Sequence, residues 1–242
     1  MDDRFYVQMT GSRNLSAIAD VADALPLVFA GDPAVTEIGA LLDAVDGVLL
    51  TGGRSNVHPT YYGVEPDSRA EPYDQERDIV ALEVTKAAVA HGIPIFGVCR
   101  GLQEMAVAYG CQLHPEIRDL PGRMNHRAPR TKGGEFHPDP SVVFSDRHDV
   151  DLLPGGQFAR ILEREKIRVN SLHGQAVTTS GKRVIIEGVA EDSTVEAISI
   201  AEAPAFALGV QWHAEYDPQT NPVNRALFEA FGQALRKKSA AG

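Results

Sequence analysis

The sequence predicts an α/β fold of the flavodoxin-like kind: a doubly wound, mostly parallel sheet with helices on both faces, plus a small antiparallel extension. Short apolar runs, as at 47–50 and 93–96, alternate with stretches in which apolar residues recur at helical spacing, as at 14–24 and 74–91. Continuous apolar strands between helices indicate a parallel sheet that is covered on both faces. Glycine-containing turns follow both apolar runs, and the carboxyl ends of parallel strands are where such sheets bind ligands.

The first part of the chain is expected to supply two helices and two strands. Helix 14–24 ends at Pro26, and residues 27–29 follow as a short strand. Pro33 is expected to begin the second helix, because proline suits the first helical position. That helix leads into the buried strand 47–50.

Two segments are too long and too polar to be plain connectors. Residues 54–73 are rich in proline and glycine and are expected to form an active-site loop. They precede helix 74–91, which Gly92 closes. Residues 114–140 form a second loop, in which four arginines suggest a patch for an anionic ligand: Arg118, Arg123, Arg127 and Arg130.

The second half of the chain is expected to be mainly extended. Apolar and β-branched residues predict strands at 142–144, 167–169, 183–187, 195–200 and 207–212. The pair at 183–187 and 195–200 forms the antiparallel extension. An amphipathic helix ends the chain, with an apolar face that consists of Val223, Leu227, Phe228, Phe231 and Leu235.

Composition excludes several classes of protein. The 242 residues are expected to form one domain, 1–242, and their net charge of -10 argues against a nucleic-acid partner. No apolar run approaches the ~20 residues of a membrane span. Cys99 and Cys111 lack C-x-x-C spacing, so a reducing cytoplasm is the expected location. The histidine and cysteine spacings match no zinc template, so no metal and no other cofactor is expected.

A cysteine between a strand and a helix is the clearest sign of chemistry. In Gly97-Val98-Cys99-Arg100-Gly101, Cys99 follows the apolar run 93–96 and precedes a helix. Paired glycines around such a residue are typical of a nucleophile elbow, the sharp turn that holds a nucleophile at the end of a sheet. The positive end of the helix dipole favours the thiolate. The alternative is a buried structural cysteine, and the glycines favour the nucleophile over it.

A histidine and a glutamate supply a matching base and orienting acid. The strand 207–212 ends in His213-Ala214-Glu215, and residues two apart in an extended chain point to the same side. Glu215 is therefore expected to orient His213, which takes the proton of Cys99. In α/β-hydrolases the acid precedes the histidine, so the order found here disfavours that fold.

Five stretches together resemble a known family. The elbow, extended to residue 103, and residues 209–215 resemble the class I glutamine amidotransferases. Three further stretches narrow the resemblance to the peptidase C26 group of free-standing γ-glutamyl-γ-aminobutyrate hydrolases. These are Leu50-Thr51-Gly52-Gly53, residues 55–63, and Asn170-Ser171-Leu172-His173-Gly174-Gln175. The resemblance covers nearly the whole chain, from about residue 14 to residue 235.

The resemblance implies a mechanism and a set of site residues. Cys99 attacks the γ-carbonyl of a γ-glutamyl amide, and water activated by His213 hydrolyses the resulting thioester. The N–H groups of Gly53 and Arg100 are expected to form the oxyanion hole. The expected substrate contacts are Gly52, Gln103, Asn170, Ser171, His173 and Gln175. The implied substrate is γ-glutamyl-γ-aminobutyrate, which gives glutamate and 4-aminobutyrate in putrescine breakdown.

Three other functions stay open from the sequence. One is a glutaminase subunit that passes ammonia to a partner synthase, and another is a γ-glutamyl hydrolase for a different amine or for folate polyglutamate. A non-catalytic binding protein on the same fold is the third. Ala214 and Tyr216 replace the proline and tryptophan that are common in the family, which leaves the amine specificity open. A homodimer is compatible with the sequence.

Members of this family begin with a strand that precedes the first helix. Here only residues 1–13 precede the helix at 14–24. Residues 4–9 have the aromatic and β-branched content of a strand, but they resemble the family's post-strand loop more closely. We therefore expect the natural protein to carry an additional first strand upstream of Met1.

Overall fold

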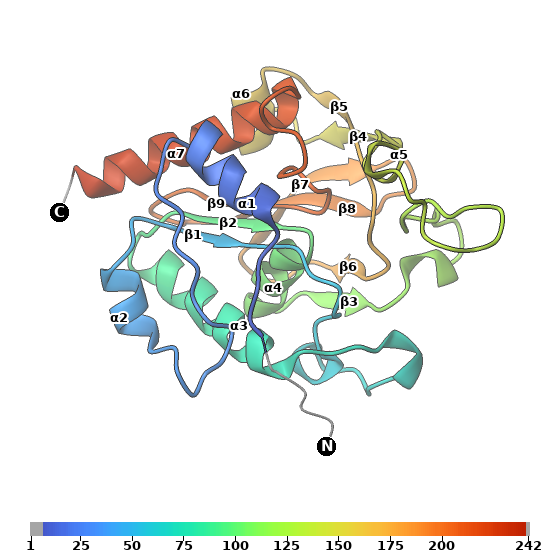
Figure 1. Ribbon diagram of the computed structural model, residues 1–242, viewed down its shortest axis with the longest axis horizontal. Helices are drawn as coiled ribbons and strands as arrows, with labels where there is room; N and C mark the ends of the chain where they lie inside the picture. Colours follow the sequence, from blue (N-terminus) through green and yellow to red (C-terminus); the bar gives the residue numbers. More distant parts are fainter. Residues whose placement is uncertain (1–6, 241–242) are drawn as a thin grey trace.

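A seven-stranded sheet lies between two layers of helices in the computed structural model, which describes residues 7–240 (Figure 1). Its strands follow the order β1-β2-β9-β8-β7-β4-β5. They are β1 (Val48–Leu50), β2 (Ile95–Val98), β4 (His148–Leu152), β5 (Lys166–Val169), β7 (Val184–Ala190), β8 (Val195–Ile200) and β9 (Ala207–Val210). A second, antiparallel sheet pairs β3 (Gln112–His114) with β6 (Ala176–Thr179).

The large sheet has a parallel part and an antiparallel part. In the parallel part β2 lies between β1 and β9, and Ile95 is in register with Val48 and Ala207. The remaining pairings, from β9 through β8, β7 and β4 to β5, are antiparallel. The antiparallel part is therefore larger than the small extension expected from the sequence, because β4 and β5 also join it.

Helices cover both faces of this sheet (Figure 1). On one face lie α1 (Ser12–Ser16), the π-helical turn η1 (Ala17–Val21), α6 (Gln157–Leu162) and α7 (Pro222–Ser239). On the other face lie α2 (Ile38–Asp43), α3 (Gln75–Ala90) and α4 (Arg100–Ala108). The shorter helices are η2 (Pro59–Tyr62), η3 (Ser68–Ala70), η4 (Ile117–Asp119) and α5 (Pro140–Val143).

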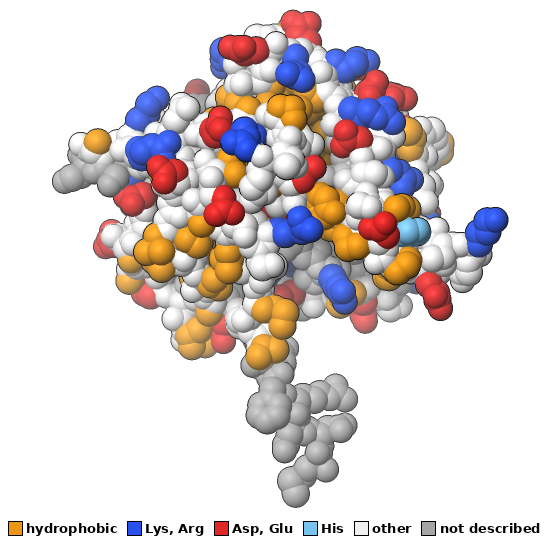
Figure 2. Space-filling model, turned by 45° about the horizontal axis from the view of Figure 1, so that its top comes forward, with side chains coloured by type: hydrophobic (Ala, Val, Ile, Leu, Met, Phe, Trp, Pro, Cys, Tyr) orange, Lys and Arg blue, Asp and Glu red, His pale blue; other side chains and the backbone are white. Residues whose placement is uncertain are grey.

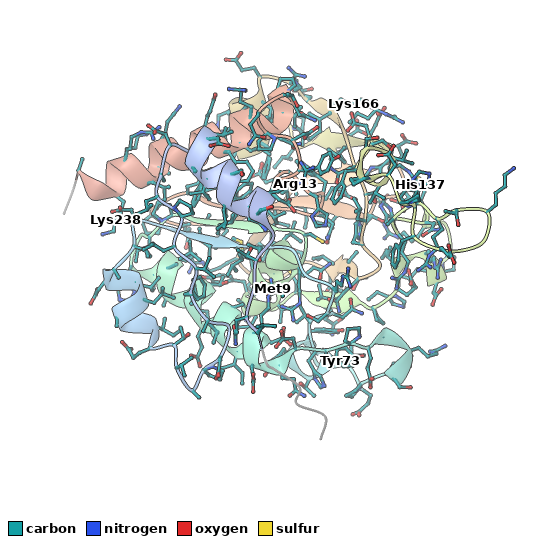
Figure 3. The ribbon with its side chains drawn as sticks, in the orientation of Figure 1. Met9, Arg13, Tyr73, His137, Lys166 and Lys238 are labelled. Carbon is teal, nitrogen blue, oxygen red and sulfur yellow. The ribbon has the colours of Figure 1, made fainter. Side chains whose placement is uncertain are left out.

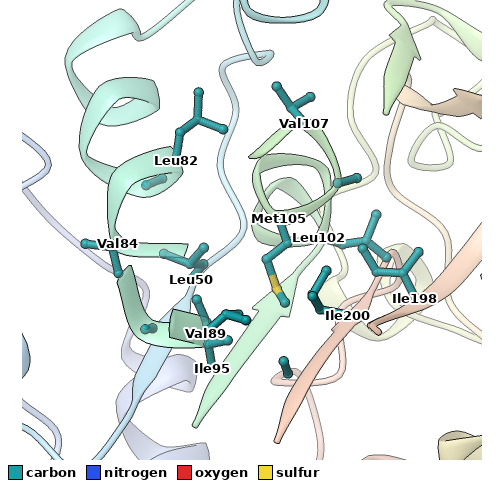
Figure 4. Close-up of a cluster of buried hydrophobic side chains, with 14 of the residues drawn as sticks. Leu50, Leu82, Val84, Val89, Ile95, Leu102, Met105, Val107, Ile198 and Ile200 are labelled. Atoms are coloured by element: carbon teal, nitrogen blue, oxygen red, sulfur yellow. The ribbon is translucent and has the colours of Figure 1, made fainter. Parts of the chain in front are cut away.

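Two apolar cores hold these layers together. One lies between the sheet and α3 and α4, and includes Leu50, Met105 and Ile198 (Figure 4). The other lies under α7 and is built around Phe96 and Trp212. The two cores meet opposite faces of the same strands, as expected for strands that are apolar throughout.

Side-chain caps explain where the longer helices begin. The carboxylate of Glu37 accepts hydrogen bonds from the N–H groups of Gly39 and Ala40, so α2 begins at Ile38 rather than at Pro33 as predicted. Asn221 caps α7 in the same way, and Pro222 occupies its first position.

Two predicted strands do not form in the described residues. Residues 27–29 have no regular structure, and Leu27 and Val28 are 64% and 60% exposed. Residues 142–144 were expected to be extended, but Asp139 and Pro140 together start the helical turn α5 there. In both cases short apolar content alone misled the prediction, because it does not distinguish a strand from other local structure.

The strand β1 forms the outer edge of the large sheet. It pairs with β2 on one side, and a cavity of about 780 Å³ lies between it and residues 24–29. Apolar side chains line this cavity, among them Leu27, Val28 and Val48. The alternative strand at 4–9 falls partly on residues 1–6, which lie outside the described residues, and residues 7–9 form no strand.

Charged side chains of both signs are interspersed on the face shown in Figure 2, with hydrophobic groups between them. This distribution differs from the clustered basic surface that nucleic-acid binding requires. Of the helices in residues 7–240, none is both long enough and apolar enough to cross a membrane.

The contact between α7 and η1 generates a prediction about stability. A Cβ on Gly232 would lie 2.1 Å from the carbonyl oxygen of Ala22 and within 2.9 Å of two further backbone atoms of that residue. An alanine normally stabilises a helix by about 1 kcal/mol relative to glycine. We expect Gly232→Ala to destabilise the protein instead, because overpacking against backbone costs about 1–3 kcal/mol.

Urea unfolding of the variant and the wild type measures this difference. Gly133→Ala is the matched control, since its Cβ would meet only Thr131 Oγ1 at 3.7 Å. A Gly232→Ala protein that is more stable than the wild type would contradict the predicted clash.

Candidate active site

Cys99 lies in a sharp turn between β2 and α4, within the parallel part of the sheet. Its φ and ψ of 52° and -103° are a conformation that residues with a side chain rarely adopt. A Cβ on Gly97 would lie 2.7 Å from the backbone of Gly101, and a Cβ on Gly101 would lie 2.1 Å from the carbonyl oxygen of Leu50. Both glycines are needed because the turn packs directly against backbone, which agrees with the elbow predicted from the sequence.

His213 and Glu215 form a short hydrogen bond next to this turn. Nδ1 of His213 lies 2.6 Å from Oε1 of Glu215, so the ring donates its Nδ1 proton to the carboxylate. A Cβ on Gly52 would lie 2.8 Å from Cε1 of His213 and 3.7 Å from Cβ of Cys99. The absence of a side chain at Gly52 therefore leaves the space in which the imidazole meets the thiol.

The charges around His213 favour its protonated form. Burial by itself lowers the pKa of the imidazole, but the Glu215 carboxylate and Cys99 beside it outweigh burial and raise this pKa well above its usual value. A cationic His213 stabilises a thiolate at Cys99, which is the form that attacks a carbonyl carbon.

Two backbone amides beside Cys99 are available for an oxyanion. Arg100 is the first residue of α4, so its N–H has no partner within the helix. Gly53 lies in the turn after β1, and Arg77 holds this turn from below by donating to the carbonyl groups of Thr51 and Gly52. Arg77 thus fixes the turn that carries Gly53, and the oxyanion hole formed by the N–H groups of Gly53 and Arg100 stays a prediction.

A buried network of charged side chains supports both the turn at Cys99 and the turn at Gly52 and Gly53. Arg100 donates to Asp78 at 2.6 Å and also contacts Glu104, which accepts from Arg77 at 2.9 Å. The side chains of Arg100, Asp78 and Glu104 are 1% exposed or less. The side chain of Arg100 is thus committed to the interior, and only its backbone can serve the oxyanion.

The predicted substrate segment 170–175 holds other active-site elements in place. Asn170 accepts the N–H of His213 at 2.9 Å and donates to the carbonyl of His213 at 3.1 Å. Gln175 accepts from the N–H of Val57 at 2.9 Å and donates to its carbonyl and to the hydroxyl of Tyr62. These two side chains therefore connect His213 and the 54–73 loop to one segment.

Three other predicted contacts point into the protein. Gln103 is 3% exposed and donates to the carbonyl of Gln175 at 2.7 Å. Ser171 lies 3.0 Å from the carbonyl of His126, and His173 contacts the carbonyl of Gln175 through Nδ1. Burial lowers the pKa of His173 to about 4, so its ring is neutral. Their direct contact with substrate stays a prediction, and the structure shows each of them in a buried hydrogen bond.

Comparison with known proteins gives the family. A family profile described as peptidase C26 matches residues 4–215. The chain is 39% identical over 216 residues to γ-glutamyl-γ-aminobutyrate hydrolase PuuD of Escherichia coli K12, a match that covers 86% of this chain and 78% of that protein.

The chain belongs to the peptidase C26 family. It is also 32% identical over 190 residues to a glutamine amidotransferase-like protein of Lactococcus lactis, covering 78% of this chain and 74% of that one. The family consists of amide-bond hydrolases, so the chain is a hydrolase, and the resemblance noted in the sequence is confirmed.

Solved structures confirm the class I glutamine amidotransferase fold. A GMP synthase component of Thermoplasma acidophilum superposes with a TM-score of 0.61 over 95% of this chain and 89% of that one, at 17% identity. The glutaminase domain of Trypanosoma brucei CTPS superposes with a TM-score of 0.61 over 93% of this chain and 88% of that one, at 15% identity. At such identities these likenesses describe the fold alone.

In this peptidase C26 protein the four arginines of the 114–140 loop do not form one patch. Arg123 donates to the carbonyl of Asp192 at 2.7 Å, and Arg130 lies over the ring of Phe136. Arg118 and Arg127 both pair with Glu116. Arg127 also lies against Gly174, so it is the member of this group that borders the 170–175 segment.

A stack of three side chains borders His213 in the candidate active site. Phe144 meets the ring of His213 edge-on and stacks on Tyr216 with 4.1 Å between ring centroids. The guanidinium of Arg13, labelled in Figure 3, lies 4.0 Å from the centroid of the Tyr216 ring. We call Phe144, Tyr216 and Arg13 the rim stack.

Sequence reasoning missed the buried charges and most of the rim stack. The sequence patterns do not single out Arg77, Asp78 or Glu104, although Asp78 and Glu104 fall on the buried side of their helices. That position was the available signal, because a charge on an apolar helix face needs a partner. Phe144 was placed in a strand, and nothing in its local sequence pointed to His213.

The raised pKa of His213 predicts the pH dependence of the reaction. The thiolate–imidazolium pair exists below this pKa, so kcat/KM is expected to fall on the alkaline side at a pH well above the ordinary histidine value of about 6.5. Glu215→Gln removes the carboxylate that raises the pKa. The alkaline limb of the pH profile should therefore move to lower pH, in addition to a loss of rate.

Glu229→Gln is the control, because Glu229 lies on the exposed side of α7, away from the site. An alkaline limb that stays in place in Glu215→Gln would show that Glu215 does not set the ionisation of His213.

The contacts of Arg77 predict a positioning role. Arg77→Lys keeps a cation beside Glu104 but cannot bridge the carbonyls of Thr51 and Gly52, because lysine lacks the planar fork of arginine. We expect kcat to fall by about 10–100-fold, which is typical for a group that orients a catalytic one, with a smaller change in KM.

Steady-state kinetics measures the two constants, and Arg69→Lys on the exposed η3 turn serves as the control. A wild-type kcat in Arg77→Lys would mean that the turn at Gly52 and Gly53 holds its shape without this clamp.

Proposed function

We propose that this protein hydrolyses the γ-glutamyl amide bond of γ-glutamyl-γ-aminobutyrate or of a closely related γ-glutamyl amine. The observation that carries the proposal is the strained Cys99 elbow beside the short His213–Glu215 hydrogen bond, in a chain 39% identical to a γ-glutamyl-γ-aminobutyrate hydrolase. The fold alone does not carry it, since solved structures with this fold include a GMP synthase subunit and a CTPS glutaminase domain.

The proposed reaction has two half-reactions on Cys99. The thiolate attacks the γ-carbonyl carbon, and the N–H groups of Gly53 and Arg100 stabilise the negative oxygen. His213 gives its proton to the departing amine nitrogen as the C–N bond breaks, which leaves a γ-glutamyl thioester. His213 then takes a proton from water, the hydroxide attacks the thioester, and glutamate leaves as the thiolate re-forms.

Substrate and location follow from this proposal. The substrate is a small γ-glutamyl amide, the reaction needs no cofactor in its steps, and a place in putrescine breakdown agrees with the name of the 39% identical relative. Cys99 and Cys111 are both free thiols, so a reducing cytoplasm suits the enzyme. Cys111 lies in the apolar core and burial raises its pKa, so it takes no part in the reaction.

A substrate panel tests the proposed specificity. We expect kcat/KM to be higher for γ-glutamyl-γ-aminobutyrate than for γ-glutamyl-butylamine or glutamine by about tenfold or more. That factor corresponds to about 1.4 kcal/mol and needs only one charge-assisted contact to the carboxylate of the leaving amine. Arg127, against Gly174, and Arg13, in the rim stack, are the candidate cations for this contact, because Arg77 and Arg100 are committed to the buried ion pairs with Glu104 and Asp78.

The panel also separates the other functions. Equal values for the three substrates, or a preference for glutamine, would favour a glutaminase subunit that supplies a synthase. Cys99→Ala should lower every rate by roughly four orders of magnitude or more, because triad members act as a unit. Unchanged turnover in Cys99→Ala, with Cys111→Ala as control, would overturn the mechanism.

A further inference from the structure

Four buried side chains converge behind the 170–175 segment and take no part in the proposed reaction. They are His126 from the 114–140 loop, His148 from β4, His173 from the 170–175 segment itself, and Glu196 from β8. Each is 6% exposed or less. Oε1 of Glu196 lies 3.4 Å from a ring nitrogen of all three histidines: Nδ1 of His126, Nε2 of His148 and Nε2 of His173.

In each ring one nitrogen faces Glu196, the inner nitrogen, and the other faces away from it, the outer nitrogen. The partner of the outer nitrogen shows which nitrogen carries the proton. Nε2 of His126 is 3.0 Å from the carboxylate of Asp192, Nδ1 of His148 is 3.2 Å from the carbonyl of Asp149, and Nδ1 of His173 is 3.1 Å from the carbonyl of Gln175. All three partners are acceptors, so each outer nitrogen carries the N–H. In a neutral ring the inner nitrogen then carries a lone pair.

The side of the cluster where the rings face Glu196 therefore lacks a hydrogen-bond donor. Three lone pairs face one carboxylate oxygen, and both oxygens of Glu196, with Nε2 of His148 and Nε2 of His173, have no hydrogen-bond partner among the described residues. The hydroxyl of Ser171 lies 3.0 Å from Nδ1 of His126, but it has the carbonyl of His126 as an acceptor at the same distance. A single proton on Glu196 would satisfy only one of the three nitrogens.

The spacing also differs from that of hydrogen bonds. An N–H···O hydrogen bond has a usual length of about 2.9 Å. By contrast, tetrahedral ligands at about 2.1 Å from a zinc ion stand about 3.4 Å from one another. The potential metal-ligand atoms of His126, His148 and Glu196 all lie within 4.8 Å of one another, which leaves room for one ion between them.

We propose that His126, His148 and Glu196 bind a divalent transition-metal ion, for which Zn²⁺ is the best fit, with His173 beside Glu196 at the edge of the site. Imidazole and carboxylate ligands suit zinc, whereas calcium and magnesium prefer oxygen alone. This proposal departs from the expectation from the sequence that no metal binds, because the ligands come from three separate stretches and form no spacing motif.

The groups around the cluster support a metal site. Metal-binding histidines usually donate their other N–H to a carboxylate or a carbonyl, as all three do here. Asp192 is itself fixed by the N–H groups of Met124 and Thr194, at 2.7 and 3.0 Å. The ion would thus tie β4 and β8 to the 114–140 loop. The contacts of Ser171 with His126 and of His173 with Glu196 link this site to the 170–175 segment.

Metal analysis of tag-free protein tests the proposal. We expect protein purified without chelator to hold one zinc ion per chain, and chelator-treated protein to regain it on addition of Zn²⁺ with a higher melting temperature. Co²⁺ in its place should give the visible absorption of a tetrahedral site. Glu196→Gln and His148→Gln should lose the ion, and Asp192→Asn should bind it about 10–100-fold more weakly.

Two controls keep the result independent of folding and of catalysis. His91→Gln, on an exposed helix end, should retain the ion, and so should Cys99→Ala, whose loss of activity would concern the proposed reaction only. Wild-type protein that neither contains zinc nor changes its melting temperature or cobalt spectrum on metal addition would overturn the proposal, whatever the variants do.

Discussion

The buried pairing of Arg100 with Asp78 and Glu104 is the interaction on which the candidate active site depends. Each of these charges would cost several kcal/mol to bury alone, so the network is stable only when all its members are in place. Arg100 follows Cys99, and Glu104 also pairs with Arg77, which donates to the turn after β1. The elbow and the predicted oxyanion turn come from different strands, and this one set of ion pairs fixes their relative positions.

The 170–175 segment has a similar role on the other side of the site. Its outer residues bind the backbone of His213 and the loop at Val57, while its inner residues, Ser171 and His173, face the histidine–glutamate cluster. A motif that resembles a substrate-binding sequence therefore acts in the structure mainly as a connector. Its conformation depends on contacts with His126 and Glu196 as well as with His213, which explains why so many polar residues are concentrated in it.

Local motifs made the geometry around Cys99 and His213 predictable from the sequence, whereas structure that depends on long-range contacts was not predictable. The glycines around Cys99 and the two-residue spacing of His213 and Glu215 are short-range signals, and the structure shows both arrangements. The ion pairs between α3 and α4 and the four-stretch cluster around Glu196 join residues whose neighbours in sequence say nothing of their partners. The strand expected at 27–29 did not form, because an apolar run becomes a strand only where another strand pairs with it.

The rim stack differs from the rest of the site in how it is held. Gly52, Gly97 and Gly101 cannot gain even a methyl group without meeting backbone or the catalytic ring, so substitutions there would disturb the reaction centre itself. Phe144, Tyr216 and Arg13 rest largely on one another, at the border of His213. A directed-evolution library aimed at new leaving amines should therefore randomise these three positions together and keep the glycines fixed. The architecture in this way separates tightly packed glycine turns from a border of side chains that can be exchanged.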